Sequence, residues 1–307
     1  MTPVAIHLAN VTKHYPRHKA LDEVSLQVPE GRCLALLGHN GAGKTTLMKL
    51  MLGLIRPSSG QVQVLGMDPA AAGLPFRRRI GFLPENVAFD EAVSGRDTLR
   101  FYARLKGVPL ADTDPLLEAV GLSFAAQRRI KTYSKGMRQR LGLAQAMLGA
   151  PGLLLFDEPT TGLDPVLRQA FFHHIRDLTT RGATVVLSSH VLTELEARTD
   201  LVAILRQGRL VAFGTLDDLR REAALPVRVR VVVGTEASVV AGRLGDGLAV
   251  TVVDGRSLEI TCRIDEKMAV FRHLTASGLP ALDIDIQLPT LDDIYLHFSH
   301  HTAEATA

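Results

Sequence analysis

The sequence predicts an α/β protein in which a sheet is covered on both faces, followed by a small α+β domain. Short, continuously apolar segments at 33–37, 152–156 and 183–189 are typical of buried strands, and helix-like segments separate them. Near Pro226 the pattern changes to short strands with hairpin-type turns, which indicates a second, smaller unit. A chain of 307 residues has room for about two domains.

The elements of the first domain follow in chain order. "CLALL" (33–37) is a buried strand, and "KTTLMKLMLG" (44–53) is the helix after a glycine-rich loop. "IRPSSGQVQVLG" (55–66) clusters Pro, Ser and Gly before alternating residues, which predicts a turn and then an exposed strand. "LRQGRLVAFG" (205–214) predicts a hairpin that turns at its Gln-Gly pair.

The second domain is predicted from Pro226 onward. Asp254 and Gly255 are expected to form a hairpin turn, and a helix over about 266–277 precedes the last strand. The expected strands are 226–233, 248–253, 257–263 and 281–287. We therefore divide the chain into a first α/β domain, a small α+β domain and a frayed tail, at 1–222, 226–298 and 299–307.

Composition and charge exclude several classes of protein. The formal net charge of +3 is small and the charged residues are mixed, which argues against a nucleic-acid binder built on a basic face. Cys33 and Cys262 lie far apart without metal-ligand spacing, so we expect a reducing compartment and neither a disulfide nor a zinc site. We expect no signal peptide, and no apolar run approaches the roughly 20 residues that span a bilayer. The chain is expected to be soluble by itself.

A glycine-rich loop, "LLGHNGAGKTT" (36–46), follows the first buried strand. The residues that match G-x-x-x-x-G-K-T are Gly38, Gly41, Gly43, Lys44 and Thr45. Glycine lets backbone N–H groups converge on phosphate oxygens, and the following helix adds its positive end. Lys44 is expected to neutralise β/γ-phosphate charge and Thr45 to hold Mg²⁺. By itself the motif leaves kinases, GTPases and motor ATPases open.

Two acidic residues follow the second buried strand in "LLLFDEPTTGLDP" (153–165). Asp157 ends the strand and is expected beside the glycine-rich loop, where it supports Mg²⁺ through water. Glu158 is expected to point elsewhere and to polarise an attacking water as a general base. Because acids often begin a loop, the pair is informative mainly in combination with the glycine-rich loop.

The stretch "YSKGMRQRLGLAQAML" (133–148) predicts a helix with one buried face. The apolar residues at helical spacing are Met137, Leu141, Ala144 and Leu148. Ser134 stands where an N-cap is needed, and Gly136 opens the start of the helix to close approach. Taken alone, this is an ordinary capped helix. It lies, however, about 20 residues before the two acids and well after the glycine-rich loop.

This order and spacing of motifs resemble the ATP-binding cassette (ABC) family over about residues 4–222. The family signature, usually L-S-G-G-Q, stands here as "YSKGM" (133–137), which retains the serine and the second glycine. "TGLD" (161–164) resembles the family's segment between protomers. The resemblance implies a P-loop NTPase, ABC-type nucleotide-binding domain with a RecA-like core, an antiparallel β subdomain and a helical subdomain. It also implies ATP and Mg²⁺ as cofactors.

The resemblance assigns roles to single residues. Tyr15 occupies the position of the aromatic that stacks on adenine, and His190 resembles the switch histidine. Glu85, in "IGFLPEN" (80–86), stands where the family has glutamine and adds negative charge beside the nucleotide. The implied catalytic residues are Glu158, His190 and Lys44. The implied nucleotide contacts are Tyr15, Gly38, Asn40, Gly41, Gly43, Lys44, Thr45, Thr46, Glu85, Ser134, Gly136 and Asp157. The implied metal ligands are Thr45 and Asp157, with Glu85 as a further oxygen donor.

The resemblance further implies partners. In the family each ATP lies between the glycine-rich loop of one protomer and the signature of the other, and this chain has one of each. We therefore expect a homodimer that drives a separate polytopic permease from the cytoplasmic face of the cell membrane. The docking groove is expected from Glu85 through 89–107, although for most of the apolar side chains there the safer interpretation is that they belong to the core. Those side chains are Phe89, Val93, Leu99, Phe101 and Tyr102.

Several segments resemble the ATPase subunit of the copper-related ABC system that matures nitrous oxide reductase. They are "GHNGAGKTT", "FLPENVAF", "SGRDTLRFYARLKG", "KTYSKGMRQRLGLAQAMLG" and, in the second domain, "LPTLDDIYLHF". This resemblance implies a permease dimer and a periplasmic accessory protein that handles copper or sulfur. His297, His300 and His301 are interpreted as a polar tail.

Other functions stay open. An ABC exporter ATPase for another substrate fits the same motifs. Soluble ABC ATPases of DNA repair or translation work without a permease, but the chain has neither a second cassette nor a long coiled-coil insertion. In a third alternative the chain is a regulatory module, with residues 226–298 sensing a ligand and the first domain acting as the switch.

Overall fold

The computed structural model describes residues 3–189, 191–244, 248–276 and 280–300. The chain divides into two compact units, residues 1–213 and 214–307, and each is described by itself. This division falls slightly before the boundary that the sequence analysis chose, because helix α8 (Leu216–Ala223) lies with the second unit.

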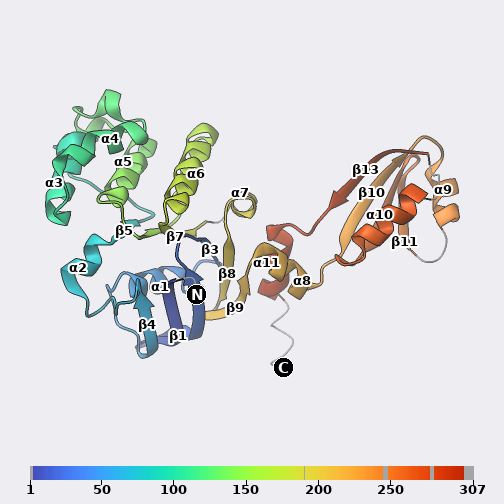
Figure 1. Ribbon diagram of the computed structural model, residues 1–307, viewed down its shortest axis with the longest axis horizontal. Helices are drawn as coiled ribbons and strands as arrows, with labels where there is room; N and C mark the ends of the chain where they lie inside the picture. The colour runs from blue at the N-terminus through green and yellow to red at the C-terminus, as the bar shows by residue number, and fades with distance from the viewer. Residues whose placement is uncertain (1–2, 190, 245–247, 277–279, 301–307) are drawn as a thin grey trace. The chain divides into compact units, whose positions relative to one another are not determined.

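The first unit contains a six-stranded sheet in the order β5-β6-β7-β3-β8-β9 (Figure 1). Its strands are β3 (Cys33–Leu37), β5 (Ile80–Leu83), β6 (Leu153–Phe156), β7 (Thr184–Ser188), β8 (Leu201–Arg206) and β9 (Arg209–Gly214). Neighbours from β5 to β8 are parallel, and every residue of β3, β6 and β7 is buried. The continuous apolar runs predicted these strands correctly because both faces of the sheet are covered. The hairpin that turns at Gln207 is also confirmed.

A second, antiparallel sheet shares its core with the first. β1 (Val4–Tyr15) lies between β2 (His18–Pro29) and β4 (Ser59–Val64). Side chains of this sheet, of β3 and of helix α1 (Lys44–Met51) form one buried cluster, which includes Ile6, Leu8, Leu34, Leu47 and Met48. The start of α1, directly after the glycine-rich loop, is thereby fixed between the two sheets.

A helical region is attached to the parallel sheet. Its helices α3 (Gly95–Lys106), α4 (Thr113–Ala119) and α5 (Lys135–Met147) contact one another, and α5 contacts β5. The Ser94 hydroxyl caps α3 by accepting from the Asp97 N–H at 3.2 Å. Short 3₁₀ turns occur at Leu110–Asp112, Ser123–Ala125 and Ile130–Thr132, and further helices are α2 (Gly73–Arg78), α6 (Pro165–Thr180) and α7 (Leu192–Glu196).

The second unit is a small α+β fold. After α8 it runs through β10 (Val227–Val233), α9 (Ala237–Leu244), β11 (Ala249–Asp254), β12 (Ser257–Cys262), α10 (Lys267–Ala276), β13 (Ala281–Gln287) and α11 (Leu291–His300). The sheet order is β11-β12-β10-β13 and its neighbours are antiparallel. With a helix after β10 and another after β12, this is the β-α-β-β-α-β arrangement. The strands and the helix predicted between 226 and 287 are confirmed.

Together these elements confirm the predicted fold class. Cys33 and Cys262 are free and buried, and burial raises the pKa of the Cys33 thiol to about 12. Among the helices in the described part of the chain, we find none that is long and apolar enough to cross a bilayer.

Candidate functional site

The glycine-rich loop connects β3 to α1 and needs glycine at two tight positions. Gly38 has φ +154°, and a Cβ there would lie 2.6 Å from the Leu205 carbonyl oxygen. Gly43 has φ +109°, and a Cβ there would lie 2.7 Å from the Ala20 carbonyl oxygen. Any other side chain would push the loop away from β8 or β2, so these glycines fix the shape that the backbone N–H groups present.

Lys44 lies among the loop carbonyls and three acidic side chains. Its ammonium donates to the Gly38 carbonyl and, at 3.2 Å, to the His39 carbonyl. Burial lowers the pKa of Lys44, while the charges of Glu158, Asp157 and Glu85 act to raise it. The acids predicted from two separate segments therefore act on one ammonium group.

The Asp157 carboxylate is held by hydroxyls from two other elements. Ser188 Oγ, at the end of β7, donates to Asp157 Oδ1 at 2.8 Å, and this contact is buried. Thr45 Oγ1, in the first turn of α1, lies 3.3 Å from Asp157 Oδ2. Asp157 also donates its N–H to the Leu83 carbonyl at 2.9 Å. A hydroxyl and a carboxylate thus face each other beside the phosphate loop, which are the oxygen donors that Mg²⁺ prefers.

Glu158 has an unusual backbone conformation. Its φ is +49°, in the left-handed region that non-glycine residues seldom adopt. Its N–H donates to Ser188 Oγ at 3.0 Å, so one hydroxyl bonds both the Asp157 carboxylate and the Glu158 backbone. Ser188 was not identified from the sequence. The sequence feature that could have identified Ser188 is its place at the end of the next buried strand. Parallel neighbouring strands end at the same edge of a sheet, so this hydroxyl is expected near Asp157.

Most of the sequence-predicted residues line one cavity of about 200 Å³. The lining residues are His18, Ala20, His39, Asn40, Gly41, Gly43, Lys44, Thr45, Thr46, Glu85, Asp157 and Glu158. Glu85, from a different segment of the chain, lines the same cavity as Lys44 and Asp157. The sequence analysis did not identify His18, Ala20 or His39.

Tyr15 lies next to this cavity through His18. The two rings stack with centroids 5.3 Å apart and an interplanar angle of 23°, and Tyr15 is 36% exposed. The Lys13 ammonium lies 5.4 Å from the centroid of the Tyr15 ring. An exposed aromatic pair at the edge of a polar cavity can accept a flat heterocycle by stacking.

The predicted signature residues lie elsewhere. Ser134 is exposed and caps α5 by accepting from the Met137 N–H at 3.2 Å. Neither Ser134 nor Gly136 is among the described residues that line the cavity. The Tyr133 side chain is buried, and its hydroxyl donates to the Ala125 carbonyl at 2.7 Å. His190 lies outside the described residues.

The segment after Glu158 contacts helix α5 and leads into helix α6. The Gln139 side chain, from α5, donates to the Pro159 carbonyl at 3.1 Å. Asp164 caps α6 by accepting from the Leu167 N–H at 3.0 Å. Within the described residues, we find no cluster of three His, Cys, Asp or Glu side chains suited to a metal ion. A cation here would therefore depend on Thr45, Asp157 and the phosphates of a ligand.

Known proteins resemble this chain along its length. Residues 21–161 match the family model "ABC transporter". The daunorubicin resistance ATP-binding protein DrrA3 of Streptomyces coeruleorubidus is 35% identical over 97% of each chain. The bacitracin transport ATP-binding protein BcrA of Bacillus licheniformis is 37% identical over 70% of this chain and 71% of its own. A solved ATP-binding subunit of an ABC transporter, 32% identical, superposes with a TM-score of 0.67 over 71% of this chain and 92% of that one.

Ser188→Ala tests the hydroxyl that joins Asp157 to Glu158. Hydrogen bonds to charged groups contribute about 1.5–3 kcal/mol, so we expect ATP turnover to fall roughly 10- to 100-fold. The variant leaves the sequence of the glycine-rich loop unchanged, so KM for ATP should change little. Steady-state phosphate release measures both quantities. The matched control is Ser189→Ala, which removes a buried hydroxyl that accepts from the Val191 N–H. Equal turnover in the two variants would contradict this role.

Proposed function

Because the chain belongs to the ABC transporter family as an ATP-hydrolysing subunit, we propose that two copies close over shared ATP and drive a separate membrane permease. One observation carries the proposal. Ser134, at the signature position, is exposed at the start of α5, and neither Ser134 nor Gly136 lines the cavity that gathers most of the other predicted residues. A second copy is the natural source of a signature for that cavity.

Within one site, we propose that the loop N–H groups and Lys44 bind the β- and γ-phosphates of ATP. Tyr15, stacked on His18, provides the surface for adenine. Thr45 and Asp157 would hold Mg²⁺, whose chemistry is to neutralise charge on the phosphate oxygens. Glu85 adds a further oxygen donor on the wall of the same cavity.

For hydrolysis, we propose that the Glu158 carboxylate accepts a proton from the attacking water. The water oxygen bonds to the γ-phosphorus as the bond to the β–γ bridging oxygen breaks. Ser188 positions Glu158 through its backbone N–H and holds Asp157 at the same time. His190 is proposed as the switch histidine on the γ-phosphate.

The dimer converts ATP into mechanical work. In the proposal, Ser134 and Gly136 of one copy contact the γ-phosphate that the partner's Lys44 holds. ATP then stabilises the closed dimer over the open one, and loss of the γ-phosphate removes that preference. Because Gln139 bonds the Pro159 carbonyl, movement of α5 is linked to the segment after Glu158.

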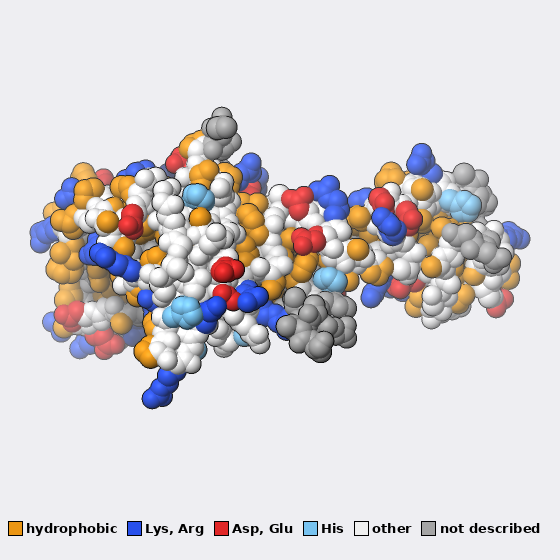
Figure 2. Space-filling model, turned by 90° about the horizontal axis from the view of Figure 1, so that it is seen from below, with side chains coloured by type: hydrophobic (Ala, Val, Ile, Leu, Met, Phe, Trp, Pro, Cys, Tyr) orange, Lys and Arg blue, Asp and Glu red, His pale blue; other side chains and the backbone are white. Residues whose placement is uncertain are grey.

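We propose that the permease docks on a groove between α2, β5 and α3. The groove holds about 270 Å³ and is lined by Leu74, Phe82, Tyr102, Leu105 and Lys106, among others. Leu74 and Leu105 are 66% and 64% exposed. Figure 2 shows hydrophobic side chains gathered beside Lys and Arg at the end of the first unit that carries α2 and α3. Burial lowers the pKa of Lys106 to about 8.

Not every apolar residue predicted for this groove is available. Phe101 is 55% exposed and packs edge to face on Tyr102, whereas Leu99 is fully buried. Leu99 therefore belongs to the core, which was the alternative interpretation of these residues. The apolar face fits an amphipathic helix that enters with its own hydrophobic side chains.

Two alternatives are considered for the transported substrate. Relatives named for daunorubicin resistance and bacitracin transport favour an exporter, which the sequence analysis held as an alternative. The copper- or sulfur-handling system of nitrous oxide reductase, with its periplasmic accessory protein, stays a prediction from the resemblance of short segments. In either case we propose a place on the cytoplasmic face of the membrane, against the permease.

Glu158→Gln tests the general base and the dimer together. The amide cannot accept the proton from water, so we expect turnover to fall about 100-fold or more while ATP still binds. The variant should sediment as a dimer with ATP and as a monomer with ADP. Lys44→Ala is the control, because it should remain monomeric with either nucleotide. A variant that binds ATP with near-normal affinity and stays monomeric would contradict the shared site.

Leu105→Glu tests the docking groove. A charge at this exposed position should abolish copurification with the permease from the same gene neighbourhood, while the ATPase rate of the isolated chain stays within about 2-fold. Phe124→Glu is the matched control, since Phe124 is 70% exposed but does not line the groove. Equal permease recovery with both variants would place docking elsewhere.

A further inference from the structure

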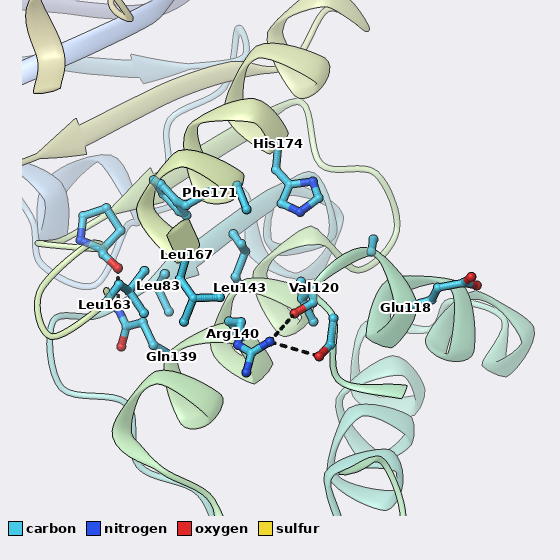
Figure 3. A pocket seen from close by; sticks show the side chains of 14 residues that line it. Leu83, Glu118, Val120, Gln139, Arg140, Leu143, Leu163, Leu167, Phe171 and His174 are labelled. Atoms are coloured by element: carbon cyan, nitrogen blue, oxygen red, sulfur yellow. Dashed lines mark hydrogen bonds between the residues drawn. The ribbon is translucent and has the colours of Figure 1, made fainter. Parts of the chain in front are cut away.

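A second cavity of about 190 Å³ lies in the first unit between α4, α5 and α6 (Figure 3). It contains none of the described residues that line the nucleotide cavity, and the proposed ATPase function does not use it. Its walls are largely apolar and include Leu83, Val120, Leu143, Leu163, Leu167 and Phe171.

The volume sets the size of a ligand. An apolar cavity of roughly 150 Å³ in a folded protein can bind benzene, so about 190 Å³ accommodates one substituted aromatic ring. The walls are also firm, because Leu143, Leu163 and Phe171 are each at most 5% exposed. Leu167 and the exposed Ala170 lie toward solvent, which leaves a route of entry along α6.

One side chain that lines the cavity, Arg140, has a buried N–H donor without an acceptor among the described residues. Arg140 Nη1 donates to the carbonyls of Val120 and Gly121, at 3.2 and 3.0 Å. Arg140 Nε is buried and has no hydrogen-bond partner among the described residues. Burial lowers the pKa of Arg140, although Asp164 and Tyr133 act to raise it. A buried guanidinium nitrogen without an acceptor is costly to the free protein.

Glu118, the acidic residue that lines the cavity, does not accept a hydrogen bond from Arg140 Nε. Figure 3 shows the Glu118 carboxyl directed away from Arg140 and from the apolar side chains. Gln139 also lines the cavity, but its amide is engaged with the Pro159 carbonyl. The cavity therefore combines apolar walls with one cationic side chain, Arg140, whose Nε has no acceptor among the described residues.

We propose that this cavity binds a small organic monoanion, a single aromatic ring that carries a carboxylate. The ring would contact Leu143, Leu163 and Leu167, and the carboxylate would accept from the Arg140 guanidinium. A carboxylate matches the planar fork of an arginine better than a single-atom anion does.

The position of the cavity gives such a ligand a regulatory effect, which rests on the proposed function. Leu163 and Leu167 are also the side chains nearest to a Cβ built on Gly136, at 3.7 Å. A ring held between them and α5 would favour the one arrangement of α5 and α6 that forms the cavity. We therefore expect the ligand to lower ATP turnover.

Benzoate is the probe, added to the full chain with leucine methyl groups labelled for NMR. We expect saturable shifts of the Leu143, Leu163 and Leu167 methyl signals, with a dissociation constant on the order of 1 mM for nine heavy atoms. Acetate at equal ionic strength should leave these signals in place. Toluene should bind without dependence on Arg140.

Two variants separate the cavity from its cation. Ala170→Phe fills the cavity from its rim and should abolish the shifts, whereas Val166→Phe, at a 75% exposed position of α6, should not. Arg140→Gln should weaken benzoate at least 5-fold and leave toluene unchanged. Absence of saturable shifts up to about 20 mM, or shifts that survive Ala170→Phe, would overturn the site. A normal ATPase rate with benzoate saturating would overturn the regulatory effect alone.

Discussion

The nucleotide site depends on the parallel pairing of β3, β7 and β6 within one buried sheet. Parallel neighbours end at the same edge, so the loop after β3, the Ser188 hydroxyl at the end of β7 and the acids after β6 meet there. The buried hydrogen bond from Ser188 to Asp157 then fixes the carboxylate, and the same hydroxyl holds Glu158 in its left-handed conformation. The order of the strands therefore places the fixed Asp157 carboxylate beside the glycine-rich loop, as phosphate chemistry requires.

The sequence predicted the parts of this arrangement in which local pattern and tertiary context agree. The apolar runs at β3, β6 and β7 are fully buried, and the motif residues around Lys44 and Asp157 line one cavity. The resemblance implied an antiparallel β subdomain, but the local pattern did not locate its long strands β1 and β2, because bulges interrupt their alternation: Asn10 has φ +48° and Glu23 φ +53°. His18 was missed because its place at the cavity depends on how β2 packs beside the loop, which no local motif encodes.

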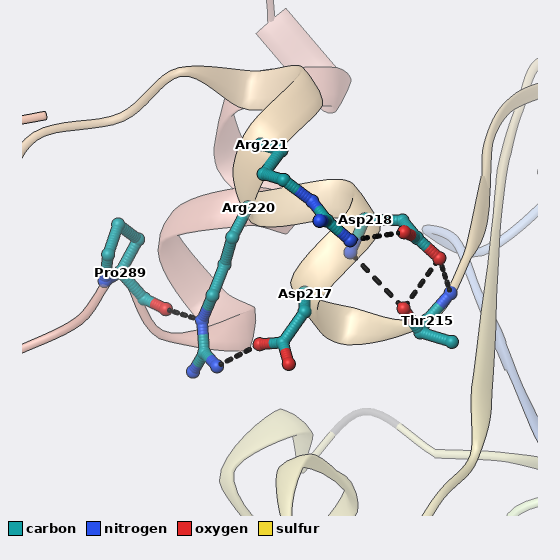
Figure 4. A network of polar contacts seen from close by, with 6 residues as sticks. All are labelled: Thr215, Asp217, Asp218, Arg220, Arg221 and Pro289. Atoms are coloured by element: carbon teal, nitrogen blue, oxygen red, sulfur yellow. Dashed lines mark hydrogen bonds and ion pairs between the residues drawn. The ribbon is translucent and has the colours of Figure 1, made fainter. Parts of the chain in front are cut away.

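In the second unit, too, the local sequence pattern predicted only some of the elements. Its strands alternate cleanly and were predicted, but α8 and α11 were not, although each begins with a threonine cap and an aspartate three residues on. Thr215 and Asp218 bond reciprocally, and so do Thr290 and Asp293. Figure 4 shows Arg220 of α8 donating to the Pro289 carbonyl and pairing with Asp217, which ties the start of α11 to α8. This hydrogen bond joins residues about 70 positions apart, so a local sequence pattern could not predict it.

Turnover by mixed dimers tests the shared site most directly. Lys44→Ala disables the phosphate loop and Gly136→Asp disables the signature, so each variant alone should be inactive. If the sites lie between copies, an equal mixture forms dimers with one intact site and recovers about a quarter of wild-type ATPase activity. If each copy completes its own site, every site in the mixture is defective. A mixture that forms dimers and stays as inactive as either variant would contradict the account.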